Sequence, residues 1–87
     1  MSQQASTDAY EDDRIAAEVH VIRLEMAVLP ALRAMDAAWI AYVREDFLSG
    51  ARRAAGVRYL AAISAYNAAW SAYKAALDAF HAAYPER

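Results

Sequence analysis

The chain has 87 residues, no cysteine and a formal net charge of −2, and 23% of its residues are charged. A chain of this length forms at most one domain and buries only about 60% of its unfolded surface, so a lone pair of helices would be marginally stable. The missing cysteines exclude disulfides, thiolate metal sites and cysteine nucleophiles. The near-neutral charge does not favour nucleic acid as a partner.

The N-terminal segment is polar, and we expect a disordered tail at residues 1–7 followed by one helical-hairpin domain at residues 8–87. The segment lacks the basic and apolar regions of a signal peptide. The longest run without a charge, Tyr59 to Tyr73, has 15 residues, which is too short to cross a membrane. We therefore expect a cytoplasmic protein with no membrane partner. The 24 alanines and the excess of Arg over Lys are typical of bacterial or phage proteins.

Ser6, Thr7 and Asp8 are suitable N-caps for a first helix that starts near Ala9. Pro30 lies inside this helix and cannot donate a backbone hydrogen bond to the carbonyl of Met26. The helix therefore either continues with a kink or stops and restarts at Pro30. No good N-cap precedes the proline, which favours the kinked continuous helix.

The first helix carries two apolar stripes about a third of a turn apart. The first stripe has spacings of 4, 3, 4 and 3 and consists of Ile15, Val19, Ile22, Met26 and Leu29. The second consists of Val21, Leu24, Val28, Leu32, Met35, Trp39 and Tyr42. Because one partner helix cannot cover both stripes, a further packing surface is required.

Ser49 and Gly50 predict a turn, in which Gly50 would adopt the left-handed conformation after the helix end. A second helix follows and ends before Pro85. Its large apolar residues repeat every 3.5 residues and predict a coiled-coil seam of Tyr59, Ile63, Tyr66, Trp70, Tyr73, Leu77, Phe80 and Tyr84. The exposed positions between them include a face of alanines that would allow another helix to approach closely: Ala61, Ala65, Ala68, Ala72, Ala75, Ala79 and Ala82.

The two helices also share a sequence pattern. LRAMDAAWIAY at residues 32–42 and ISAYNAAWSAY at residues 63–73 are identical at six of eleven positions, including both tryptophans. Duplication, convergence on one packing solution and coincidence in an alanine-rich chain all remain open. A hairpin with its turn near Gly50 places residues whose numbers sum to about 100 side by side, so Val28 would lie level with Tyr73.

These patterns predict an all-α fold: an antiparallel helical hairpin, its first helix kinked or broken at Pro30, which dimerises into a four-helix bundle. The second helix covers the second stripe and leaves the first stripe exposed, a larger apolar patch than a soluble monomer usually tolerates. The expected homodimer interface is this first stripe: Ile15, Val19, Ile22, Met26 and Leu29.

No pattern in the chain indicates catalysis or a cofactor. The sequence has neither a Gly-x-Ser-x-Gly turn nor a glycine-rich phosphate loop, so we expect no enzyme activity. His20, Asp78 and His81 are a weak metal-ligand set that the hairpin register would bring to one end. Two solvated histidines beside a helix seam are the ordinary outcome, and no metal is expected.

The turn region has a local positive charge, because four arginines accompany Glu45 and Asp46. The arginines either bond helix-end carbonyls and nearby carboxylates or dock an acidic partner protein. The residues of this expected partner-binding tip are Arg44, Arg52, Arg53, Arg58 and Tyr59.

The aromatic residues leave three alternatives: rings that reach the edges of the core, a protein contact, or a pocket for a flat apolar ligand. The pocket would be lined by Trp39, Tyr42, Tyr66, Trp70 and Tyr73. We expect a non-enzymatic protein–protein interaction module, such as an adaptor, inhibitor or assembly factor that works as a homodimer. The alternative is a carrier or sensor of a small apolar or aromatic ligand.

Overall fold

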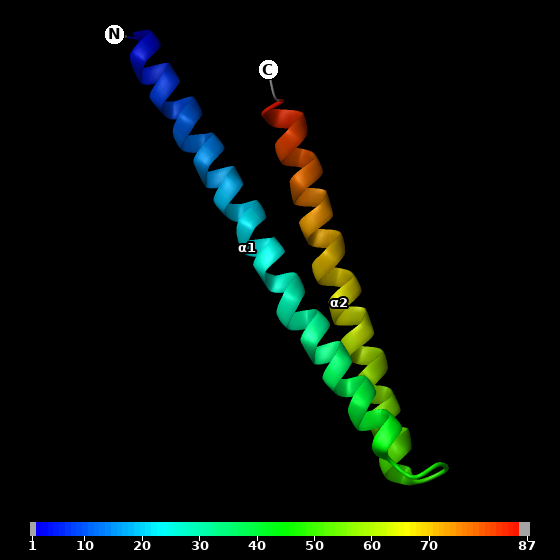
Figure 1. The fold of residues 1–87 in the computed structure, drawn as a ribbon. Helices are drawn as coiled ribbons and strands as arrows, with labels where there is room; N and C mark the ends of the chain where they lie inside the picture. The colour runs from blue at the N-terminus through cyan, green and yellow to red at the C-terminus, as the bar shows by residue number, and fades with distance from the viewer. Residues whose placement is uncertain (1, 86–87) are drawn as a thin grey trace.

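The computed structural model describes residues 2–85 and contains two helices, α1 at Ser2–Arg44 and α2 at Gly50–Ala83. They run antiparallel and are joined by the short connection 45–49 (Figure 1). The molecule is a rod that measures 71 × 16 × 16 Å. The all-α hairpin predicted from the two periodic segments is thus confirmed.

α1 is one continuous helix that includes Pro30. It therefore follows the continuous alternative of the prediction and does not restart at the proline. The helix begins at Ser2 and not near Ala9, so the capping residues Ser6, Thr7 and Asp8 lie within it. Residues 3–5 are Gln, Gln and Ala, which are good helix formers, and this segment contains no residue that interrupts a helix.

The inward side of α2 differs from the predicted seam at three of its eight positions, which are Ile63, Trp70 and Leu77. The tyrosines at 59, 66 and 73 and Phe80 do face α1, but alanines fill the alternate places. Trp70, which we expected in the seam, is 45% exposed, and Ile63 and Leu77 lie at its edge. The alanines on the inward side are Ala55, Ala62, Ala69 and Ala76. The rings repeat every 3.5 residues with either set of neighbours, the large residues or the alanines. Side-chain size alone favours the large residues, which are not the ones that face α1.

α1 presents the same alternation of large and small side chains. Val21, Leu24, Val28, Met35 and Tyr42 face α2 as predicted. Trp39 is 47% exposed and lies beside the seam instead of in it. The half-buried residue next to Trp39 is Ala38, and Ala31 is half-buried two turns earlier.

Ring contacts confirm the predicted antiparallel register. The Trp39 and Tyr59 ring centroids lie 5.2 Å apart near the connection, and those of Tyr10 and Tyr84 lie 5.5 Å apart at the open end. Gly56 lets the helices approach closely, since a Cβ atom there would lie 3.3 Å from the Tyr42 ring. Trp39 and Trp70 also have nearly equal exposure, which is consistent with a repeated packing unit.

The hairpin encloses little core. Among the described residues, only Val21 and Ala55 are buried, and no side chain is completely buried. Two helices have only one seam to share, so every large residue at its edge keeps solvent contact. The hairpin therefore lacks the enclosed interior that stabilises most domains.

The connection holds a strained residue at a position we did not predict. Leu48, not Gly50, has a positive φ of 68°. Gly50 is the first residue of α2, and Ser49 caps that helix by accepting a hydrogen bond from the Arg52 N–H at 3.0 Å. A left-handed conformation costs a non-glycine residue about 1 kcal/mol or more.

Leu48→Gly should therefore increase the free energy of unfolding by about 1 kcal/mol relative to Leu48→Ala. Both variants remove the same exposed side chain, but only glycine relieves the strain. Urea unfolding followed by circular dichroism measures the difference. Equal midpoints for the two variants would show that the backbone at Leu48 is unstrained.

Candidate interaction surface

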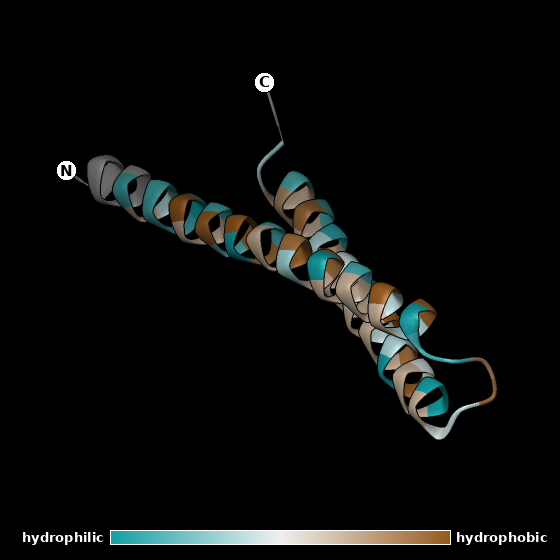
Figure 2. Ribbon diagram, turned by 60° about the horizontal axis from the view of Figure 1, so that its bottom comes forward, coloured by the Kyte–Doolittle hydropathy of each residue, from teal (hydrophilic) through white to brown (hydrophobic). Residues whose placement is uncertain are grey.

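One side of the hairpin is apolar and open to solvent. Residues seven apart in sequence lie near one line along a helix and so form a row. Three neighbouring rows of this kind on α1 carry most of its exposed apolar residues. Hydrophobic residues recur along α1 and extend into the connection (Figure 2). We call this side the apolar face; it comprises Ile15, Val19, Ile22, Met26, Leu29, Leu32, Trp39, Ile40 and Val43 of α1, with Ile63, Trp70 and Leu77 of α2.

The stripe expected to remain outside the hairpin is exposed. Met26 is 69% accessible, and Ile15, Val19, Ile22 and Leu29 are exposed as well. The prediction that α2 leaves these side chains uncovered is therefore confirmed. Whether a second chain covers them remains a prediction.

The alanine face of α2 is also exposed. All seven alanines named above are solvent-accessible, and other small side chains make the close contact with α1. On α1, Ala27, Ala34 and Ala41 are exposed too, and by their spacing they lie on the side away from the apolar face. The two broad sides of the hairpin thus differ: one carries large apolar residues and the other carries small ones.

A groove lies at the centre of the apolar face. It has a volume of about 490 Å³, and its apolar lining includes Leu29, Pro30 and Trp70. Glu25 and Arg33 lie one turn to either side of Leu29 and also line it. A side-chain hydrogen bond to Glu25, together with desolvation and the charge of that carboxylate, raises the pKa of Tyr73 above its ordinary value. The groove thus has an acidic end and a basic end.

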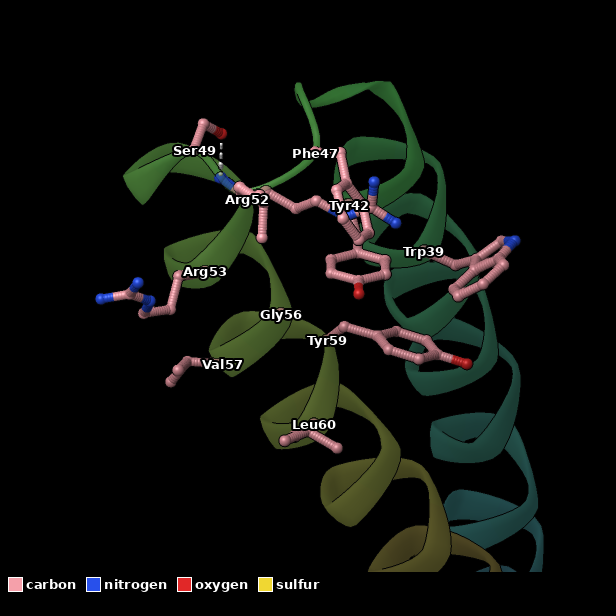
Figure 3. Close-up of a pocket in the computed structure, with 11 residues that line it drawn as sticks. Trp39, Tyr42, Phe47, Ser49, Arg52, Arg53, Gly56, Val57, Tyr59 and Leu60 are labelled. Atoms are coloured by element: carbon pink, nitrogen blue, oxygen red, sulfur yellow. Dashed lines mark hydrogen bonds between the residues drawn. The ribbon is translucent and has the colours of Figure 1, made fainter.

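A second groove lies beside the connection and has a volume of about 610 Å³ (Figure 3). The guanidinium of Arg52 lies 4.6 Å from the Tyr42 ring centre and 5.1 Å from that of Phe47. Such contacts hold an arginine over aromatic faces. The Tyr59 ring stacks on Tyr42 at 6.4 Å and packs against Trp39, which completes an aromatic wall.

The structure divides the expected tip residues. Arg52, Arg53 and Tyr59 line the groove beside the connection, whereas Arg44 and Arg58 are exposed and do not line it. Phe47 and Leu48 were missed, although they are 75% and 85% exposed. Two adjacent large apolar residues in an otherwise polar turn were the available signal.

The aromatic residues expected to line one ligand pocket lie in separate places. Trp39 and Tyr42 line the groove beside the connection, Trp70 and Tyr73 line the central groove, and Tyr66 lines neither. The rings follow the seam along the rod, so they cannot enclose one ligand. Four of the five residues are thus divided between the two grooves, and a ligand held by any of them remains a prediction.

In the described part of the chain, no three His, Asp or Glu side chains gather into a group that could hold a metal ion. His20, Asp78 and His81, the candidate set, are exposed and are not brought together.

Near the open end, Arg14 pairs with Glu11 at 3.1 Å and with Glu18 at 3.2 Å. These exposed pairs also raise the pKa of Arg14, chiefly through the hydrogen bond to Glu11.

Comparison with known proteins gives no match to a family model, to a curated protein or to a solved structure. Between residues 2 and 85, neither helix has a stretch long and apolar enough to span a membrane. The surface itself is therefore the basis for a functional proposal.

Proposed function

We propose that this protein is a non-enzymatic protein–protein interaction module that works as a homodimer, in which the apolar faces of two hairpins pack together as a four-helix bundle. The observation that carries this proposal is the exposure of the apolar face along most of α1. Arg33 and Asp36 interrupt the face, but exposed apolar surface on this scale marks an interaction site.

The exposed area of the chain supports the same conclusion. The hairpin exposes 6736 Å², whereas a compact monomer of its mass exposes about 5,100 Å². A standard interface buries about 800 Å² on each partner, and obligate dimers bury more. The excess of about 1,600 Å² is thus sufficient for an extensive dimer interface. A second copy of the chain would supply the enclosed core that the single hairpin lacks.

The tip is the proposed contact for a further protein. Phe47 and Leu48 lie in the connection at the end of the rod, and both side chains are largely exposed. Leu48 keeps a strained backbone while its side chain makes little contact within the hairpin. Strain without a packing benefit is typical of functional positions. The adjacent arginines favour an acidic partner surface.

A carrier of a small apolar ligand is the second candidate, and the groove beside the connection favours it. Its volume of about 610 Å³ lies within the range of small-molecule sites, and its lining is largely aromatic and aliphatic. Native mass spectrometry of protein purified from its host tests this candidate. A co-purified small molecule would support it, and a spectrum of the bare chain would count against it.

Affinity capture from host cells tests the proposed module. The wild-type chain is compared with a Phe47→Ser/Leu48→Ser variant, which keeps the apolar face. We expect the wild type to enrich a specific protein and the variant to lose it at an unchanged dimer mass. Identical sets of captured proteins for both chains would contradict a contact at the tip.

A further inference from the structure

The apolar face is centred on Leu29. On the row of α1 formed by Ile15, Ile22, Leu29, Asp36 and Val43, the two end residues lie fourteen residues to either side of Leu29, and Asp36 is the one charged member. The central groove, which Leu29 shares with Trp70, lies at the same level. A two-fold axis perpendicular to the rod at this level would place residues of two α1 helices level with each other when their numbers sum to 58. Ile15 would then lie level with Val43 of a second copy, and Val19 with Trp39.

The charges of the central groove match this arrangement. The same axis places Glu25 level with Arg33 of the second copy. By the two-fold symmetry, Arg33 of the first copy lies level with Glu25 of the second, so the same pair forms twice. Among the described residues Arg33 has no ion pair within its own chain. A parallel dimer would instead place Glu25 against Glu25 and Arg33 against Arg33. Like charges in direct opposition are unfavourable.

The ends of the rod carry opposite net charges, and the attraction rests on Arg52, Arg53 and Arg58 of α2. The residues of α1 and the connection that this axis makes level there are like-charged: Asp12 with Asp46, Asp13 with Glu45, and Arg14 with Arg44. Residues 8–18 at the open end contain five carboxylates and one arginine, whereas residues 44–58 at the tip contain four arginines and two carboxylates. Antiparallel packing places the acidic end of each chain beside the basic tip of the other. Parallel packing would place the two acidic ends together.

We propose that the occupant of the apolar face is a second copy of this chain in antiparallel orientation, with the two-fold axis at Leu29 and reciprocal contacts between Glu25 and Arg33. This inference rests on the proposed homodimer and adds its orientation and register. It also assigns both grooves, since the second copy seats Val19 beside Trp39 and closes the central groove over Trp70.

Single cysteines in this cysteine-free chain test the orientation by cross-linking. Leu48→Cys at the tip and Ala9→Cys near the open end both replace exposed residues. After the two variants are unfolded, mixed and refolded together, a short bis-maleimide should link position 48 of one chain to position 9 of the other. Leu48→Cys alone should give no linked dimer, because the two tips lie about 55 Å apart at 1.5 Å per residue.

Charge reversal tests the register. Glu25→Arg and Arg33→Glu should each weaken the dimer severalfold in sedimentation equilibrium, and the double variant should recover most of the affinity. Failure of the double variant to recover would overturn the reciprocal contact.

The outcomes separate the orientation from the dimer itself. A dimer in which Leu48→Cys links to itself, or in which the mixed link does not form, overturns the antiparallel arrangement and leaves the homodimer standing. A folded monomer at all concentrations overturns both and assigns the face to a different protein.

Discussion

Met26→Glu/Leu29→Glu should convert the proposed dimer to monomers. The double variant places four carboxylates at the centre of the proposed interface, and an unpaired charge buried in such a place costs several kcal/mol. We expect the dimer dissociation constant to rise more than 100-fold. Since the single hairpin buries so little, the monomer should also lose much of its helical circular dichroism at 25 °C.

The matched control is Ala65→Glu/Ala72→Glu, which adds the same charge at exposed positions of α2 on the alanine side. This variant should keep the dimer mass and the helix content of the wild type. Dissociation by the alanine-side variant, with a stable dimer in the other, would assign the interface to the opposite side of the hairpin.

Ala69→Leu should destabilise the protein by about 1–3 kcal/mol, because the added atoms must fit between two helices already in contact. Ala69 lies in the seam, where small residues alternate with tyrosines. Thermal unfolding by circular dichroism should show a fall in Tm of at least about 4 °C.

Ala68→Leu provides the comparison, since it makes the same change at the adjacent, exposed position. Alanine and leucine both have high helix propensity, so the difference in unfolding free energy between the two variants reports packing. Ala68→Leu should shift the free energy of unfolding by less than about 0.5 kcal/mol. An equally small effect of both substitutions would restore the seam of large residues that the sequence favours, because Ala69 would then lie outside the contact with α1.

The sequence predicts the hairpin well, because its cues are local. Periodic apolar residues define both helices, and Ser49 marks the start of the second. The register follows from the position of the turn. The inward face of α2 was the main error: Tyr59, Tyr66 and Tyr73 fit equally with Ala62 and Ala69 or with Ile63 and Trp70 as their neighbours. Only the packed structure shows which set faces α1.

The candidate interaction surface was predictable in part for a similar reason. A helix with two apolar stripes and one partner must expose one of them, and the structure exposes the stripe that includes Met26. The grooves combine residues from both helices, such as Leu29 with Trp70, and depend on rotation about each helix axis. The left-handed backbone at Leu48 has no sequence signature, because leucine seldom adopts it.

Light scattering during size-exclusion chromatography tests the homodimer most directly. The chain has a mass of 9.6 kDa, and we expect twice this value at micromolar concentration, with a transition to unfolded monomer on dilution. A fully helical monomer of 9.6 kDa that is stable at every concentration would contradict the account.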